Sequence, residues 1–533
     1  MIFELLGNFV LFLITISIIY VVNFYYKYFT RINPLPGPLP FPLIGNFPQV
    51  FLWFNGNPHK FRDYCYEKYG DIYEIHGAMR TIVLCRREYL ECLLSKSTYG
   101  TRYPNSVKPD ELGIETKGLT LNNNFKSWTF NHHLFNQAIL SPKFTDVVID
   151  QTNKLFNELE SYWDKLFLKE DIIKENKNIL DFPGWIYHYT NDIIIKLLTG
   201  EKYYSMAAYF NTLSDEKSDH PSVNVEDSVI FFQELRKLFA GYSLFLFILP
   251  FIRYHIPFFK NKTNDTIRSL RYFNQKLETI IERRRQEIKD TPLEEPLPHD
   301  ILTSMIIKNA FRDVNYIEVG KAARSMTNSE IRANLLDGII NGTFKITDTL
   351  SFIIYYIAHN SDVEKKIIEE IDNVFQGDKM RPITKDDFYS LSYCEAIVKE
   401  VARISPNLYS FSRCFDKSEE IAGYQWPANT LFKINVRAIH NDDNDWEEPN
   451  KFNPDRWLVE GFEQKNNSFI MFGGGLRICP GRKLAMIELV CLIALLFRKY
   501  EINLVDMNSP IKTWSNSVLV SCEKLLVEIK QRN

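Results

Sequence analysis

The sequence predicts a mainly α-helical fold with small β-sheets, arranged as one large domain behind an N-terminal apolar segment. Residues 150–320 interleave charged and apolar residues in a helical pattern, and residues 328–357 form a long, mostly apolar helical stretch. Short β-like runs lie at residues 73–75 and 81–84. A glycine-rich loop at residues 472–481 leads directly into another apolar helical stretch. These features favour helices as the framework, with strands at its periphery.

The composition is typical of a large globular protein and not of a nucleic-acid-binding one. The 533 residues include 40 Phe and 28 Tyr, enough to bury a sizeable core. The net charge is only −3, so the basic excess that marks nucleic-acid-binding proteins is missing. None of the eight cysteines forms a CxxC pair, which indicates reduced thiols in a cytosol-facing protein.

Residues 1–30 are predicted to form a membrane anchor. Residues 5–26 carry no charge and, at about 1.5 Å per residue, can cross a bilayer core of about 30 Å. A cleaved signal peptide is the alternative, but its apolar part is shorter and ends at a small-residue site that we do not find here. Lys27 and Arg31 follow the apolar run and favour a cytosolic location for the rest of the chain. We therefore expect a single-pass signal anchor.

A single cysteine lies in the loop Phe472-Gly-Gly-Gly-Leu-Arg477-Ile-Cys479-Pro-Gly481. The glycines allow a tight turn and a close approach to a flat group. Cys479 lies where the following helix is expected to begin, and free N–H groups there favour a thiolate, which is suited to bind iron. The alternative is a buried structural cysteine beside a turn.

This ten-residue pattern resembles the haem-ligand loop of the cytochrome P450 family, with every signature position filled. The resemblance implies a cytochrome P450 fold, in which haem b lies between a long distal helix and the cysteine loop. It also implies that Cys479 is the axial thiolate ligand of the iron and that Arg477 binds a haem propionate. Phe472 and Gly481 belong to the same signature and are expected beside the cofactor.

The proline-rich segment after the anchor supports this resemblance. Alternating prolines at positions 34–42 stiffen an extended chain and prevent a helix. Directly behind an anchor, such a segment resembles the hinge of microsomal members of the family. The expected division is therefore an anchor at residues 1–30, a hinge at 31–50 and a catalytic domain at 51–533. The microsomal resemblance implies the endoplasmic reticulum, with the catalytic domain facing the cytosol.

A second motif is Glu400-x-x-Arg403, followed by Pro406. On a helix, a Glu/Arg pair at this spacing is usually a weak surface pair. Together with Arg456 in the downstream sequence Phe-Asn-Pro-Asp-Arg-Trp, it resembles the family's buried Glu–Arg–Arg triad. The resemblance assigns Glu400, Arg403 and Arg456 a folding role beneath the haem loop.

Three more residues are aligned with haem contacts by the resemblance. Arg413 takes the place of a propionate-binding arginine. Trp128 fills the family's tryptophan position on a predicted helix at residues 128–139, but His132 stands where the family has an arginine one turn later. A histidine can donate the same hydrogen bond, although it is cationic only part of the time near neutral pH. The alternative is that His132 is a surface polar residue.

The long stretch at residues 328–357 corresponds to the distal helix, with an N-cap expected at Asn328 or Ser329. Gly342 interrupts it, and the resemblance implies a kink there that opens an oxygen pocket. The family usually carries an acid and an alcohol just after this glycine, which help deliver protons to bound oxygen. Here Phe344 stands at the acid position and Lys345 at the alcohol position.

The resemblance implies a haem-thiolate monooxygenase that inserts one atom of O2 into a lipophilic small molecule. The chain shows no flavin or NADPH site of its own, so a separate NADPH-dependent flavoprotein reductase would supply electrons, with Arg482 and Lys483 as candidate docking residues. Lys345, Thr343, water or a substrate hydroxyl would deliver the proton, and the alternative is that Lys345 points away from the iron.

Two other functions stay open. The first is an isomerase or dehydratase of a (hydro)peroxide that needs neither O2 nor a reductase, because family members of that kind often lack the acid–alcohol pair. The second is a non-catalytic haem-binding protein, which the loss of that pair would also explain.

Overall fold

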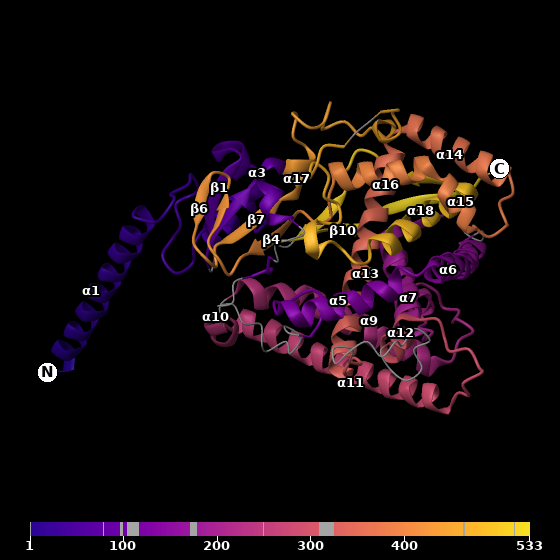
Figure 1. The fold of residues 1–533 in the computed structure, drawn as a ribbon, viewed down its shortest axis with the longest axis horizontal. Helices are drawn as coiled ribbons and strands as arrows, with labels where there is room; N and C mark the ends of the chain where they lie inside the picture. The colour runs from indigo at the N-terminus through magenta and orange to yellow at the C-terminus, as the bar shows by residue number, and fades with distance from the viewer. Residues whose placement is uncertain are drawn as a thin grey trace.

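The computed structural model confirms a mainly α-helical fold with small sheets (Figure 1). It describes residues 2–77, 79–95, 100–103, 117–170, 178–248, 250–308, 324–461, 464–515 and 518–532. The helices are α1 (Ile2–Phe29), α2 (Phe47–Phe54), α3 (Pro58–Tyr69), α4 (Leu90–Leu93), α5 (Phe125–Ile139), α6 (Pro142–Glu170), α7 (Phe182–Thr199), α8 (Ser205–Leu213), α9 (Ser222–Phe247), α10 (Pro250–His255), α11 (Pro257–Asp290), α12 (Ile301–Ile307), α13 (Asn328–Ala358), α14 (Ser361–Phe375), α15 (Lys385–Ser390), α16 (Ser392–Ile404), α17 (Val436–His440) and α18 (Arg482–Lys499). The strands are β1 (Ile72–His76), β2 (Arg80–Leu84), β3 (Ile179–Asp181), β4 (Ser410–Cys414), β5 (Glu419–Ile421), β6 (Tyr424–Trp426), β7 (Leu431–Asn435), β8 (Tyr500–Leu504), β9 (Lys512–Ser515), β10 (Val520–Lys524) and β11 (Leu526–Gln531).

The strands form small sheets at the edges of the helical body. The largest has the order β1-β2-β7-β4, with β2 and β7 parallel and the other pairs antiparallel. A second sheet has the order β3-β11-β8, and two hairpins pair β5 with β6 and β9 with β10. The β-like runs predicted at residues 73–75 and 81–84 fall inside β1 and β2.

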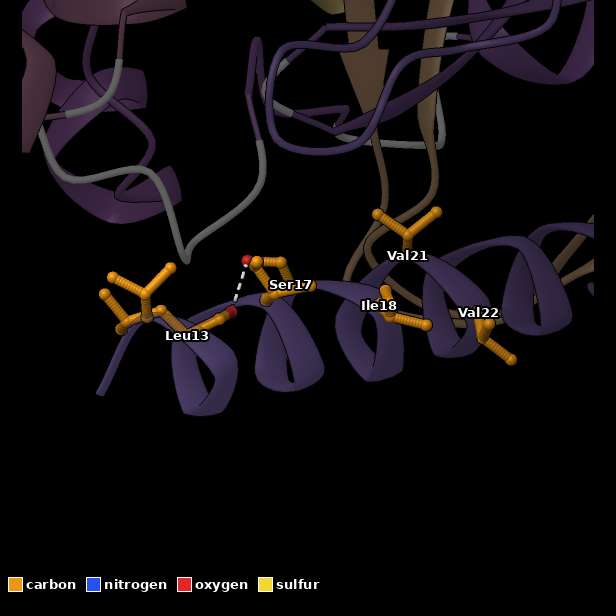
Figure 2. A pocket seen from close by; sticks show the side chains of 7 residues that line it. Leu13, Ser17, Ile18, Val21 and Val22 are labelled. Atoms are coloured by element: carbon orange, nitrogen blue, oxygen red, sulfur yellow. Dashed lines mark hydrogen bonds between the residues drawn. The ribbon is translucent and has the colours of Figure 1, made fainter. Parts of the chain in front are cut away.

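Helix α1 projects from the body (Figure 1). Among the described residues, it is the one helix long and apolar enough to cross a membrane, and its most apolar 18-residue stretch has a mean hydropathy of 2.5 and no buried residue. Its side chains form a shallow apolar groove from Val10 to Val22, where Ser17 donates a hydrogen bond to Leu13 O at 2.8 Å (Figure 2). This groove belongs to a single exposed helix.

The proline-rich segment lies against strand β1. Glu74 N donates to Pro36 O at 2.9 Å, and a Cβ on Gly37 would lie 2.2 Å from Glu74 O. Gly45 adopts φ +57°, and a Cβ there would lie 2.1 Å from His76 O. Arg31, just beyond α1, pairs with buried Glu74 at 2.5 Å. The end of α1 and the hinge are therefore fastened to the edge of the main sheet.

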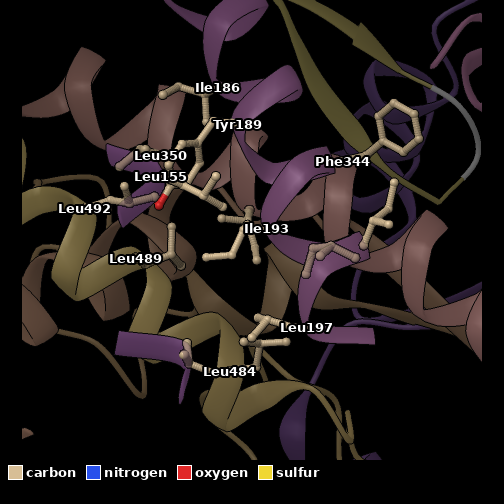
Figure 3. Close-up of a cluster of buried hydrophobic side chains, with 14 of the residues drawn as sticks. Leu155, Ile186, Tyr189, Ile193, Leu197, Phe344, Leu350, Leu484, Leu489 and Leu492 are labelled. Atoms are coloured by element: carbon tan, nitrogen blue, oxygen red, sulfur yellow. The ribbon is translucent and has the colours of Figure 1, made fainter. Parts of the chain in front are cut away.

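The main core is formed by the long helices α6, α7, α13 and α18. Ile193 and Leu197 of α7 lie beside Leu489 and Leu484 of α18 in one buried cluster (Figure 3). Helices α7 and α18 are apolar over most of their surface and are buried along nearly their whole length. Helix α18 directly follows the cysteine loop, so this core holds one end of the candidate site.

Helix α13 differs from the expectation at its start. Its N-cap is Thr327, because Thr327 and Glu330 form a reciprocal capping box. The helix runs from Asn328 to Ala358 and includes Gly342. A Cβ at Gly342 would lie 2.6 Å from Ile194 of α7, so this glycine allows α7 to approach α13 closely.

Candidate active site

The cysteine loop is a compact turn between residue 470 and α18. Gly473 and Gly475 adopt φ values of +73° and +67°, which favour glycine. A Cβ on Gly475 would lie 2.6 Å from Leu94 O, so the loop also touches the chain after α4. Cys479 N donates to Phe472 O at 2.9 Å and closes the turn. Gly473 and Gly475 are therefore explained by the backbone conformation of the loop and, at Gly475, by the close contact with Leu94.

Cys479 differs from the other cysteines in its surroundings. It is partly exposed, as is Cys92, but it alone lies on this loop, and a Cβ on Gly481 would be 3.9 Å from its Sγ. Burial raises the pKa of every other thiol in the chain and so disfavours a thiolate there. The thiols with raised pKa belong to Cys65, Cys85, Cys92, Cys394, Cys414, Cys491 and Cys522.

The helix after the loop begins later than the sequence suggested. Its first residue is Arg482 and its N-cap is Gly481, so Cys479 precedes the first helical turn. The guanidinium of Arg482 instead donates a hydrogen bond to Cys479 O at 3.1 Å.

Arg477, Trp128 and His132 come together on one side of the loop. Buried Arg477 lies over the Trp128 ring at 4.9 Å and donates hydrogen bonds to Leu119 O and Asn122 O. His132 stacks on Trp128 with 4.4 Å between ring centroids. Burial, together with the positive charge of Arg477, lowers the pKa of His132 to about 4. His132 is therefore neutral near pH 7 and can donate a hydrogen bond without adding a charge.

Arg413 approaches the loop from strand β4. It is buried, and its guanidinium donates to Gly474 O at 3.4 Å. A Cβ on Gly100 would lie 2.9 Å from the Arg413 side chain, so the chain at residue 100 holds the arginine closely. Arg413 from β4 thus reaches the same short loop that carries Arg477.

Lys345 lies on the side of α13 that faces this loop. Its Nζ donates to Asn341 Oδ1 at 3.0 Å, and Asn341 Nδ2 donates to Asp337 O at 2.7 Å. Burial lowers the pKa of Lys345, and Arg102 adds to this effect, while the charges of Cys479 and Asp337 oppose it. In the described residues, no carboxylate forms an ion pair with this ammonium group.

Thr343 and Phe344, the two residues before Lys345, pack against neighbouring helices. Phe344 stacks on Phe239 of α9 with 4.1 Å between ring centroids and lies 5.6 Å from Tyr187 of α7. Thr343 is fully buried, and its carbonyl oxygen accepts a hydrogen bond from Thr190 of α7 at 2.9 Å. Since two residues correspond to about 200° around a helix, Thr343 and Lys345 face nearly opposite directions.

Glu400, Arg403 and Arg456 meet in a buried cluster beneath the loop. Glu400 and Arg403 are both 0% exposed and share two hydrogen bonds of 2.9 and 2.8 Å. Arg456 Nε donates to Glu400 Oε1 at 3.1 Å. Asn453 N and the indole of Trp457 also donate to Glu400, at 3.0 and 2.9 Å. The carboxylate therefore joins α16 to the segment around residues 453–457.

Sequence reasoning gave no role to His440, which connects this cluster to the cysteine loop. Its Nδ1 donates to Ala402 O at 3.2 Å, and its Nε2 accepts a hydrogen bond from Ile470 N at 2.8 Å. Burial lowers its pKa to about 3, so it is held as the neutral tautomer that this pattern requires. Arg403 also donates to His440 O at 3.0 Å. The signal in the sequence was a histidine at the end of a short helix between the two motifs.

The donor set fits the haem that the resemblance implies. One partly exposed thiol, Cys479, is available for an axial position of the iron. Arg477 and Arg413 lie beside the loop with guanidinium groups that suit two propionates, and Trp128 adds an indole N–H nearby. Lys345 of α13 lies close enough for the charge of Cys479 to act on it. These residues come from α5, β4, α13 and the cysteine loop.

Comparisons with known proteins identify the family of the chain. The family model described as Cytochrome P450 matches residues 35–529. Cytochrome P450 4d1 of Drosophila melanogaster is 25% identical over 400 residues, which is 74% of each chain. Cytochrome P450 3A9 of Rattus norvegicus is 23% identical over 94% of this chain and 92% of its own. Cytochrome P450 3A14 of Cavia porcellus is 24% identical over 99% and 97%.

Proposed function

The chain belongs to the cytochrome P450 family of haem-thiolate monooxygenases, and from this premise we propose that it inserts one atom of O2 into a lipophilic small molecule, with Cys479 as the iron ligand. The observation that carries the proposal is the loop geometry around Cys479, where one accessible thiol lies among Arg477, Arg413 and Trp128. When bound, the haem supplies oxygen activation, which a cysteine thiolate promotes by donating electron density.

The protein's own residues hold the cofactor and its surroundings. Arg477 and Arg413 would bind the propionates through charge-assisted hydrogen bonds, and Trp128 and neutral His132 lie beside Arg477. The Glu400 cluster and His440 hold the cysteine loop in a fixed position relative to α16. Phe472 and Gly481 shape the turn, and Gly481 leaves space beside the sulfur.

Lys345 is the proposed proton donor on the distal side. Its lowered pKa means that the ammonium releases a proton more readily than an ordinary lysine. Asn341 holds the amine through a 3.0 Å hydrogen bond, which fixes its position. Thr343 does not contribute in this proposal, because its side chain is buried at the contact with α7.

A separate NADPH-dependent flavoprotein reductase is the proposed electron source. Arg482 and Lys483, at the start of α18, are partly exposed and lie beside the cysteine loop, so they are candidates for its docking surface. We propose that α1 anchors the chain in the endoplasmic reticulum membrane with residues 51–533 in the cytosol. The apolar, uncovered surface of α1 supports the anchor.

A second candidate is rearrangement or dehydration of a (hydro)peroxide, which already carries its O–O bond. The observation in its favour is Phe344, since the usual acid position belongs here to an aromatic contact with Phe239. A double variant, Phe344→Asp with Lys345→Thr, separates the two candidates. Gain of coupled oxygenation supports a monooxygenase ancestry, while unchanged behaviour supports another proton route or none.

The proposal is tested by a carbon monoxide difference spectrum with two reductants. One sample receives dithionite, and the other receives NADPH with a microsomal reductase. A red-shifted thiolate–CO band in both supports Cys479 ligation and the electron route. The band with dithionite alone favours the peroxide enzyme or a non-catalytic haem protein. Absence of the band in both overturns the assignment of Cys479.

A further inference from the structure

A second cavity lies away from the cysteine loop, at the C-terminal ends of α13 and α16. It has a volume of about 370 Å³, and α17 and the segment at residues 450–452 complete its wall. None of its lining residues belongs to the candidate active site. Small-molecule sites typically occupy about 300–1,000 Å³, so this cavity is large enough for a small organic ligand.

The polar groups of this cavity are mainly donors. Its lining includes Arg437, Asn450 and Tyr355 and contains no Asp or Glu. Arg437 is exposed, and in the described part of the chain no acceptor takes a hydrogen bond from its guanidinium. Within the same residues, the hydroxyl of Tyr355 and the side-chain amide of Asn450 also have no hydrogen-bond partner. The cavity therefore offers a positive charge and two further donors.

Aromatic rings form part of the remaining wall, beside polar residues. Tyr356 and Phe452 lie with 5.0 Å between ring centroids and 30° between planes, and Tyr355 lies 5.7 Å from Tyr356. The hydroxyl of Tyr356 is engaged with Ser405 Oγ at 2.8 Å, which fixes this ring. Aromatic rings next to an arginine suit a ligand that combines a ring with an anionic group.

Asp63 is a carboxylate on which the charge of Arg437 acts, and it is already engaged. The charge of Arg437 acts on Asp63, where it opposes the rise in pKa that burial causes. Asp63 does not line the cavity, and the hydroxyl of Tyr409 donates a hydrogen bond to it. The guanidinium therefore has donor capacity left for a ligand oxyanion.

We propose that this cavity binds a small aromatic anion, a carboxylate or phosphate whose oxygens pair with Arg437 and whose ring lies against Tyr355 and Phe452. The planar fork of arginine matches both oxyanions in a bidentate manner. Such a ligand joins the ends of α13 and α16 to the segment that also carries the Glu400 cluster. This site is independent of the proposed activity.

The test uses the haem-loaded full-length protein in a buffer without phosphate. Phenyl phosphate, benzoate and neutral phenol are titrated by calorimetry, with the haem pocket filled by phenylimidazole. We expect saturable binding of at least one anion. Phenol should bind at least about tenfold more weakly, because hydrogen bonds to charged groups are stronger than those between neutral groups. Loss of anion binding in the presence of phenylimidazole places the ligand in the haem pocket and overturns the proposal.

Variants distinguish binding at this cavity from nonspecific attraction of anions to positive charge on the protein. Arg437→Gln is expected to weaken anion binding by about tenfold or more, because it removes the charged donor. Arg268→Gln is the matched control, since Arg268 is exposed on α11 and pairs only with Asp265 at 3.4 Å among the described residues. Asn450→Leu gives a second, uncharged perturbation. An unchanged thiolate–CO band verifies folding, and equal affinity of Arg437→Gln and wild type overturns the proposal.

Discussion

Glu400→Gln is the substitution whose cost the structure defines best. Glu400 accepts five hydrogen bonds from Arg403, Arg456, Asn453 and Trp457, and its side chain is 0% exposed. Glutamine keeps one acceptor oxygen but turns an N–H2 group toward the donors at Oε2. It also leaves two buried guanidinium groups without their counter-charge. Removing one partner of a buried ion pair costs about 3–5 kcal/mol.

That loss is a large part of a typical stability of about 5–15 kcal/mol, so the variant is expected to yield little haem-loaded protein. The assay compares thiolate–CO yield and thermal unfolding with those of Glu395→Gln. Glu395 lies on the same helix and pairs with Lys399 at 2.7 Å on the surface, where such a pair is worth about 0–1 kcal/mol. If Glu400→Gln melts within error of this control, the cluster does not support the fold as we argue.

Three further predictions concern α13. Gly342→Ala is expected to lower the melting temperature. Overpacking against Ile194 costs about 1–3 kcal/mol and outweighs the gain in helix propensity of about 1 kcal/mol. A higher melting temperature would refute the packing role of Gly342. Lys345→Met is expected to reduce coupled oxygenation by about 10²-fold or more while the thiolate–CO band persists, and undiminished product per NADPH would exclude Lys345 as the donor. Burial raises the pKa of Asp348 from 3.8 to about 7, so the folded state keeps a proton that the unfolded chain releases. The free energy of unfolding therefore falls as pH rises from 3.8 to about 7. Asp348→Asn should flatten this fall in unfolding curves measured across that range, and an unchanged slope would contradict it.

The sequence predicted the framework because its signals are local. The apolar helical stretches, the β-like runs and the glycine-rich loop each carry their information within a few residues, and the structure has all of them. The mainly helical fold with small sheets is thus confirmed. The N-cap was wrong by one to two residues, because the reciprocal bonds of Thr327 and Glu330 decide it.

What the sequence missed depends on contacts between distant segments. The need for Gly342 comes from Ile194 in another helix, and no pattern near residue 342 shows this. The bridge made by His440 requires the positions of Ala402 and Ile470 together. The roles of Cys479, Arg477 and Arg413 came from the family pattern, and the structure places these residues around one loop without testing their chemistry.

The attachment of the proline-rich segment to β1 has a mechanical consequence. A flexible linker would let an N-terminal helix and the domain behind it tumble separately. Here Arg31 holds the end of α1 to Glu74, and Gly37 and Gly45 press the following chain onto the same strand. A change in the direction of α1 is therefore transmitted to the sheet, which a flexible linker would not do. Any surroundings that set the tilt of α1 also set the direction in which the whole body faces.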